Sequence, residues 1–390
     1  MRISQIDILR VGLPFDAGRL SRADTSQVET SAVDDKTDAF NAASRHLQRM
    51  ETLLVRVSTD DGHVGWGEGF GHLINPVTFA ALAGPVGRYF LHAEVTADPA
   101  SFSGTMLAAH QAFHAFGRTG PVLFALSAID TALWDLCAQA AGVPLHRLLG
   151  AERDAVSVYA SLVSYDNDPA EVAYQVKRAQ AAGFKKMKLH ETTRAAIAAA
   201  REALPSDVAL MVDVNCPWTL EEAQREVSGL RDLSLGWVEE PIWPPDDVNG
   251  LAALRASGVP LSAGENASGV QGFRSLFEAG AVDIAQPSVA KIGGISGMLD
   301  VIRLASTFDV AVVPHCFYYG AGLLATANLV ATLPQSVSLE IPWLQWPEPL
   351  HAAQNTGATL QLDTGPGLNF RPDDRVIERY LIDKASLRAQ

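Results

Sequence analysis

The sequence predicts an α/β protein, a (β/α)8-type TIM barrel preceded by an N-terminal α+β capping domain. Ionisable residues recur at a nearly constant interval: Asp213 lies 25 residues after Lys188, and Glu239 and Glu265 follow at steps of 26. Each lies at the end of a short apolar run, and one strand, one helix and two short loops occupy about this length. The C-terminal ends of barrel strands meet at one face, so these side chains should converge on one pocket.

The interval continues through the second half of the predicted barrel. Lys291, His315 and Glu340 follow at steps of 26, 24 and 25 residues, again in or just after apolar runs. Before Lys188, residues 156–164 can serve as strand one, and the count reaches strand eight at 336–342. A barrel of about 250 residues accounts for only part of the chain, so a second domain is expected.

The N-terminal part does not keep this interval. Residues 3–13 and 52–59 alternate apolar and polar side chains, and Asp60-Asp61-Gly62 separates the second run from 64–68, which predicts a β-hairpin. Ala-rich helical sequence follows from 76 to 116. Antiparallel strands followed by helices are typical of a separate α+β domain.

A polar, charged stretch at about 15–50 separates the first two predicted strands. So long a connection in a compact domain is usually functional or disordered. We expect a lid over the barrel mouth, with a disordered loop as the alternative. The expected division is a capping domain at 1–125, a catalytic barrel at 126–360, and a segment at 361–390 that returns to the capping domain.

Helix-start signals agree with the barrel. Asp168-Pro169-Ala170-Glu171 supplies an N-cap, a first-turn proline and a capping glutamate, and Gly183 ends that helix. Thr219-Leu220-Glu221-Glu222 repeats the capping box. Both helices precede a strand that carries a candidate site residue.

Composition limits the function classes. The chain has 390 residues, a formal charge of −14 and a pI near 5.1, which argues against a nucleic-acid or anionic-membrane partner. Its three cysteines, without CxxC spacing, fit a reducing compartment. With no signal-like N-terminus and no run of 18 apolar residues, a cytoplasmic location is expected.

The three carboxylates Asp213, Glu239 and Glu265 predict a metal site, because clustered anions in a partly desolvated pocket repel one another. Oxygen-only ligands favour a hard cation, Mg²⁺ first, with Mn²⁺ or Ca²⁺ as alternatives. Lys186 and Lys188 lie two apart on a strand and share a face. Two adjacent ammonium groups lower each other's pKa, which favours a lysine base.

The motifs together resemble the enolase superfamily, in its mandelate racemase/muconate lactonizing enzyme family and within that the mandelate racemase branch. The resemblance covers nearly the whole chain and rests on ALSAIDTALWD at 125–135, K-x-K at 186–188, V-D-x-N at 212–215, W-x-E-E-P at 237–241, G-E-N at 264–266, K-I-G-G at 291–294 and the terminal Glu340. It implies an Mg²⁺ enzyme that removes a proton α to a carboxylate and stabilises an enediolate. It also implies a small-molecule carboxylate substrate and a homo-oligomer, a dimer or octamer.

By this resemblance, Lys188 takes the α-proton, Lys186 assists it, and His315 acts from the opposite side as proton donor. Glu340 would donate a hydrogen bond to the substrate carboxylate, which requires it to be protonated. The expected substrate-binding residues are Lys186, Asn215, Ser288, Lys291 and Glu340.

One position departs from the family pattern. The mandelate racemase branch carries an aspartate at the strand-six position, where this chain has Ser288, so His315 lacks an ionised partner to raise its basicity. A one-base dehydration of a hydroxy acid or acid sugar fits this better than a two-base racemase or epimerase, with a lactone cycloisomerase as third alternative. A metal-free Schiff-base enzyme and a non-catalytic carboxylate-binding relative remain open.

Overall fold

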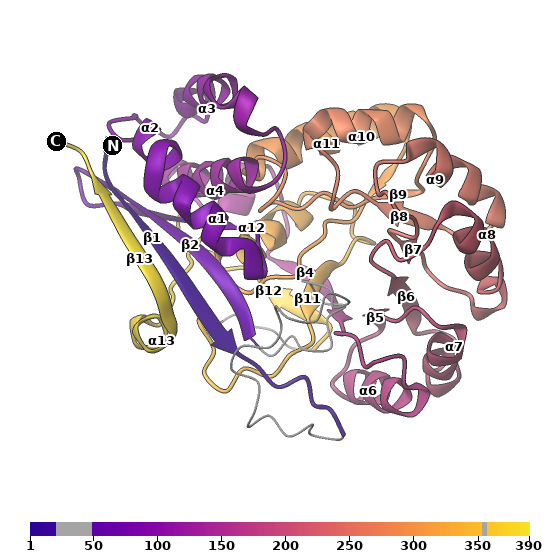
Figure 1. The fold of residues 1–390 in the computed structure, drawn as a ribbon. Coiled ribbons are helices and arrows are strands. Elements are labelled where there is room, and N and C mark those ends of the chain that lie inside the picture. Colours follow the sequence, from indigo (N-terminus) through magenta and orange to yellow (C-terminus); the bar gives the residue numbers. More distant parts are fainter. Residues whose placement is uncertain (21–48, 353–356) are drawn as a thin grey trace.

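The computed structural model describes residues 1–20, 49–352 and 357–390. A barrel and a smaller antiparallel sheet lie beside each other, with the two chain termini together at the edge of the smaller sheet (Figure 1). Most of the predicted lid at 15–50 lies outside the described residues.

Eight parallel strands form the barrel. They follow one another around the sheet in chain order, and the last strand pairs with the first. Their bounds are β4 (Ala155–Ser161), β5 (Lys186–Leu189), β6 (Ala209–Asp213), β7 (Val238–Glu239), β8 (Leu261–Ala263), β9 (Ile284–Ala285), β10 (Ala311–Val312) and β11 (Leu339–Pro342). The barrel predicted from the residue spacing is therefore confirmed.

Helices connect these strands along the outside of the barrel (Figure 1). They are α6 (Pro169–Ala181), α7 (Arg194–Ala203), α8 (Leu220–Ser228), α9 (Val248–Leu254), α10 (Gly269–Glu278), α11 (Gly294–Phe308) and α12 (Ala321–Val330), with 3-10 turns at Arg231–Leu233 and Arg255–Ser257. The side chain of Asp168 caps α6, and Thr219 and Glu222 form the reciprocal capping box of α8. The predicted helix starts are confirmed.

One seam of the barrel is closed by a side chain. Among the described residues, β10 and β11 share no strand ladder. The Glu340 carboxylate on β11 instead accepts a hydrogen bond of 2.7 Å from the backbone N–H of Cys316, which follows β10. A candidate site residue therefore also joins the two strands.

The capping sheet combines both ends of the chain. Its order is β13-β1-β2-β3, antiparallel throughout, and β2 and β3 form the predicted hairpin. The strands are β1 (Ile3–Pro14), β2 (Arg49–Thr59), β3 (Val64–Gly69) and β13 (Leu381–Arg388). Shorter elements are α1 (Asn75–Ala81), α2 (Gly87–Tyr89), α3 (Ala100–Ala112), α5 (Leu145–Leu148), α13 (Asp374–Tyr380) and β12 (Thr359–Gln361), which pairs with β4.

Helix α4 (Pro121–Ala141) packs against β3. This approach requires glycine: a Cβ on Gly67 would lie 1.8 Å from the carbonyl oxygen of Ala128.

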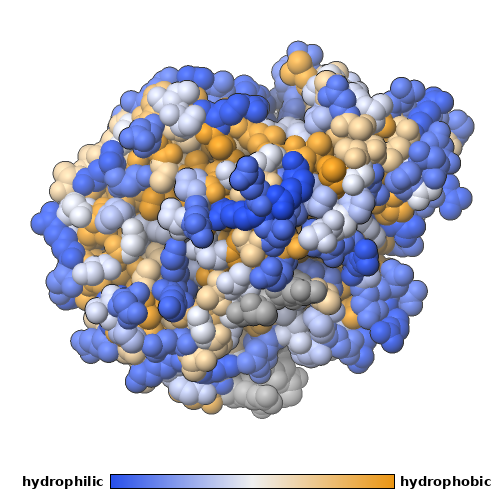
Figure 2. All heavy atoms as spheres, turned by 180° about the vertical axis from the view of Figure 1, so that it is seen from behind, coloured by the Kyte–Doolittle hydropathy of each residue, from blue (hydrophilic) through white to orange (hydrophobic). Residues whose placement is uncertain are grey.

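The length and composition of α4 would allow it to cross a membrane, yet 83% of its most apolar window is buried inside the protein. Apolar and hydrophilic side chains are interspersed on the face in Figure 2. The expected domain boundary at 125/126 falls within α4, and the division of the chain stays a prediction.

Glu68 on β3 links the capping sheet to the barrel. Its Oε2 atom accepts a hydrogen bond of 2.9 Å from the backbone N–H of Gly322, at the N-terminus of α12. A Cβ on Gly320 would lie 2.6 Å from the same oxygen, so glycine leaves room for the carboxyl. Burial raises the pKa of Glu68 to about 7, against the effect of the Gly322 hydrogen bond.

We predict that Glu68→Gln changes how stability depends on pH. The unfolded carboxyl ionises near pH 4.5 and the folded one near 7. The native state therefore binds more protons between these values, and Glu68 lowers stability as pH rises through this window. Replacing Glu68 with glutamine therefore raises the free energy of unfolding by an amount on the order of 3 kcal/mol at the upper end of this pH window.

Calorimetric melting temperatures from pH 5 to 8 check this. The melting temperature of Glu68→Gln should rise relative to that of the wild type as pH rises. The melting temperature of the exposed control, Glu378→Gln, should depend on pH as that of the wild type does. Parallel curves for both variants would show that Glu68 is not the buried acid described.

Candidate active site and metal centre

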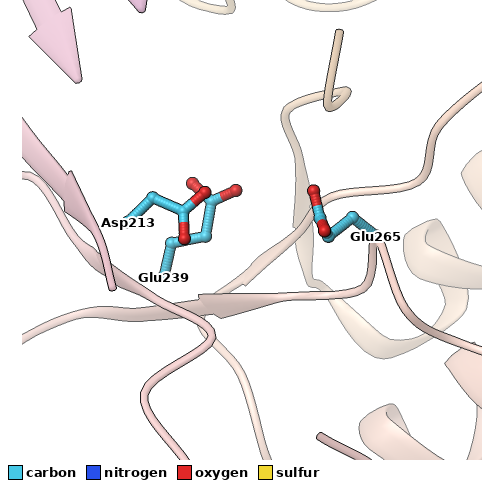
Figure 3. Close-up of side chains that lie close together, drawn as sticks. All are labelled: Asp213, Glu239 and Glu265. Atoms are coloured by element: carbon cyan, nitrogen blue, oxygen red, sulfur yellow. The ribbon is translucent and has the colours of Figure 1, made fainter. Parts of the chain in front are cut away.

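Three carboxylates meet at the C-terminal ends of adjacent strands. Asp213 ends β6, Glu239 ends β7, and Glu265 follows β8. One oxygen from each lies within 4.8 Å of the others. Asp213 and Glu239 lie side by side, and Glu265 faces them across the site (Figure 3). Gly264 permits the bend before Glu265, because its φ of +136° is a conformation that L side chains rarely adopt.

Burial and mutual repulsion make this cluster unfavourable by itself. Burial, followed by the charge of Asp213, raises the pKa of Glu239 well above its usual range. Burial opposes ionisation of Glu265 too, but Lys291 and His315 outweigh it and hold the pKa of Glu265 well below its usual range. Three converging carboxylate oxygens suit a hard divalent cation, which would relieve this repulsion. The donor set therefore fits the expected ion.

Lys188 lies fully buried beneath the cluster. Its Nζ atom is 3.3 Å from Asp213 Oδ2, 3.0 Å from Glu239 Oε1 and 2.8 Å from Glu340 Oε1. Burial alone would lower the pKa of Lys188, yet the carboxylates of Glu239 and Glu340 outweigh burial and raise that pKa well above its usual range. This direction is opposite to the lowered pKa that the sequence led us to expect for Lys188.

The structure does not bring Lys186 into the cluster. Its Nζ atom donates to the Ser336 carbonyl oxygen at 3.0 Å and to Ser338 Oγ at 2.9 Å, just before β11. Side chains two apart on a strand share a face but lie at different depths. Lys186 therefore lies toward the opposite end of the barrel from the carboxylates. Partial burial, not Lys188, lowers the pKa of Lys186.

His190 was missed by the sequence analysis. It follows β5, is 4% exposed, and its Nε2 atom lies 3.4 Å from Asp213 Oδ2. Its Nδ1 atom contacts the carbonyl oxygen of Leu162, which favours a proton on Nδ1 and leaves Nε2 as the nitrogen that faces the carboxylate cluster. The same strand alternation that joins Lys186 and Lys188 continues to His190. That alternation was the available signal.

His315 approaches from the other side of the cluster, after β10. Its Nε2 atom is 2.8 Å from Glu265 Oε2. Its buried Nδ1 atom has no hydrogen-bond partner among the residues that the structure describes. Ser288 lies 3.3 Å from the hydroxyl of Tyr318 through its Oγ atom, and no hydrogen bond joins this side chain to His315 in the described chain. His190 and His315 therefore contact opposite members of the carboxylate set.

Glu340 differs from its expected protonated state. Burial favours the neutral acid, but Lys188 and His315 outweigh it and hold the pKa of Glu340 below its usual range. The carboxylate forms an ion pair with Lys188 and accepts a hydrogen bond from the backbone of Cys316. It therefore acts as an acceptor in this structure.

The remaining predicted binding residues lie at the rim of the cluster. Asn215 donates to Asp213 Oδ1 at 2.5 Å through its side-chain amide. Lys291 Nζ lies 3.5 Å from Glu265 Oε1 and 4.4 Å from the centre of the Phe70 ring. Phe70 follows β3, so the capping domain contributes to the wall around the site.

The chain matches two family models. Residues 27–150 match the N-terminal domain of mandelate racemase/muconate lactonizing enzymes, and residues 171–376 match the enolase C-terminal domain-like model. The D-galactarolactone cycloisomerase of Agrobacterium fabrum is 31% identical over 78% of this chain and 82% of its own length. The L-talarate/galactarate dehydratase of Salmonella typhimurium is 30% identical over 79% of this chain and 76% of its own length.

A solved structure is similar over the full length. L-talarate dehydratase from Polaromonas sp. JS666, complexed with Mg and L-glucarate, superposes with a TM-score of 0.81 at 25% identity, covering 100% of both chains. The similarity thus includes the capping sheet as well as the barrel.

Removing one cluster carboxylate should abolish tight cation binding. We expect Glu239→Gln to weaken Mg²⁺ or Mn²⁺ binding by roughly 100-fold, about 2.7 kcal/mol, because an anionic ligand is lost. The exposed Glu221→Gln variant loses the same charge outside the cluster and should bind as the wild type does. Isothermal titration calorimetry measures both, and equal affinities in the two variants would remove Glu239 from the metal site.

Proposed function

Because the chain belongs to the mandelate racemase/muconate lactonizing enzyme family of the enolase superfamily, we propose that it is an Mg²⁺-dependent dehydratase of a hydroxy acid or acid sugar. Its first step is removal of the proton α to the substrate carboxylate. The observation that carries this proposal is the pair of buried histidines, His190 and His315, which contact opposite members of the carboxylate cluster.

Asp213, Glu239 and Glu265 would hold the ion. Bound Mg²⁺ supplies Lewis-acid stabilisation of negative charge on the substrate carboxylate, which makes the α-proton easier to remove. Lys188, beside this set, would supply a second positive charge to the same carboxylate. Asn215 would fix the orientation of Asp213 through its side-chain hydrogen bond, and Glu340 would fix that of Lys188 through their ion pair.

The proton acceptor comes from β5 or the residues directly after it. Lys188 is the base expected from sequence, but its ammonium is held by three carboxylates. His190 is the better candidate in this geometry, because the Leu162 carbonyl favours a proton on Nδ1 and leaves Nε2 facing the cluster, where the Asp213 carboxylate would stabilise an imidazolium. The α-proton would then move to His190 Nε2.

His315 would act as the acid. A protonated imidazole gives its proton to the departing β-hydroxyl, which leaves as water, and the remaining enol rearranges to a 2-keto acid. The absence of an ionised partner at Ser288 suits this role, since a donor need not be a strong base. Proton exchange with the solvent then removes the proton from His190 and returns one to His315.

A lactone cycloisomerase is the second candidate. The Agrobacterium fabrum relative is named for that reaction, and opening a lactone ring by elimination would also use a base at the α-carbon and an acid for the leaving oxygen. A two-base racemase or epimerase fits less well, because His315 would have to act as a base without an orienting partner on Nδ1 among the described residues.

Proton NMR in D2O with Mg²⁺ and a panel of hydroxy acids, acid sugars and lactones tests the reaction. We expect the α-proton signal to disappear with the growth of 2-keto acid signals, and chelation to stop both. Exchange without new products would indicate a racemase or epimerase. No loss of any α-proton, with Mg²⁺ bound, would contradict the proposal and favour a carboxylate-binding protein.

Variants assign the roles in the same assay. His190→Asn should slow α-proton loss by about 10²–10⁴-fold. His315→Asn should retain α-proton exchange but lose elimination, and Lys186→Ala should match the wild type because Lys186 lies outside the cluster. If His190→Asn kept full activity and Lys188→Ala lost α-proton removal, the base would be Lys188 and not His190.

A further inference from the structure

His72 is a buried histidine of the capping domain that none of the proposed steps uses. It begins the 3-10 turn His72–Ile74 just after β3, and its side chain is 5% exposed. Its φ of +38° lies in the left-handed region, which is uncommon for residues other than glycine. Backbone strain of this kind is concentrated at functional sites.

The aromatic neighbours of His72 connect it to the proposed active site. Phe70 and Phe317 lie with ring centres 4.9 and 6.3 Å from the His72 ring. The Phe70 ring is also 6.0 Å from that of His315, and the Phe317 ring is 5.6 Å from that of His190. His72 is therefore one ring away from each of the proposed proton-transfer groups.

The imidazole of His72 has unused hydrogen-bonding capacity. Its Nδ1 atom is buried and has no partner among residues 1–20, 49–352 and 357–390. A buried polar atom without a partner is destabilising, so such an atom calls for an explanation. Burial, followed by the charges of His315 and Lys291, lowers the pKa of His72 to about 4. The ring is therefore neutral near pH 7 and offers one donor and one acceptor.

We propose that His72 is a substrate-binding residue, which hydrogen-bonds a hydroxyl of the substrate beyond the reacting α- and β-carbons. This assignment rests on the proposed function and narrows its substrate class to polyhydroxylated acids. A hydroxyl both donates and accepts, so it satisfies either tautomer of a neutral imidazole. Phe70 and Phe317 shield that hydrogen bond from water, which makes it more selective.

A pair of substrates that differ only beyond C3 tests the assignment. Glycerate has an α-proton and a β-hydroxyl but no further hydroxyl, whereas six-carbon aldonates have several. In His72→Gly, which tolerates the backbone angle, we expect kcat/KM and the affinity for the best-bound aldonate to fall about 10- to 100-fold. The same quantities for glycerate should change less than about threefold.

Two further variants separate binding from folding. His72→Asn accepts a left-handed backbone and keeps a polar atom near the position of Nδ1, so it should recover part of the aldonate affinity. His92 is exposed and has a φ of +69°, so His92→Gly is a matched control and should leave both ligands unaffected.

Calorimetric titration with Mg²⁺ present measures affinity independently of turnover. Equal losses for aldonate and glycerate in a folded His72→Gly protein, or no loss for either, would overturn the assignment, and so would a wild type that binds no aldonate. Aldonate binding that depends on His72, without α-proton loss in the wild type, would overturn the proposed reaction and leave the binding role standing.

Discussion

The balance of buried charge at the barrel mouth is the constraint on which the rest of the site depends. Asp213, Glu239 and Glu340 surround the buried ammonium of Lys188, and Glu265 completes the carboxylate cluster beside Asp213 and Glu239. Buried anions are tolerated only when paired, and a single lysine cannot neutralise four of them. His190, His315 and Lys291 lie at the edge of the cluster and reduce the excess negative charge further. A divalent cation would complete the balance, and the same positive charges would then face the substrate carboxylate.

The fold serves this balance in two ways. Parallel strands bring carboxylates from separate βα units to one face of the barrel, and Glu340 also closes the seam between β10 and β11. The capping sheet supplies the wall above them, where Phe70 covers Lys291 and His72 contacts Phe317. In the proposed reaction, the barrel would position the reacting groups, while the capping domain would face the part of the substrate that does not react.

Most of the fold could be predicted from the spacing of residues and from local sequence signals. The positions of side chains that depend on contacts between distant elements could not. The spacing located all eight strands, and the Thr219 capping box located a helix start, because both depend on nearby residues. Lys186 was misplaced because alternation specifies a face of the strand and not the depth within the barrel. His190 was missed although the same alternation reaches it. The position of His72 depends on how the capping sheet packs against the barrel, which no local pattern specifies.

Anomalous diffraction from crystals containing Mn²⁺ tests the charge-balance account most directly. One strong manganese peak is expected, within about 2.5 Å of oxygens from Asp213, Glu239 and Glu265, with Lys188 still beside Glu340. A peak bound elsewhere, or none at this cluster under saturating Mn²⁺, would contradict it. In that case Lys188, Lys291 and the two histidines alone would have to neutralise the carboxylates.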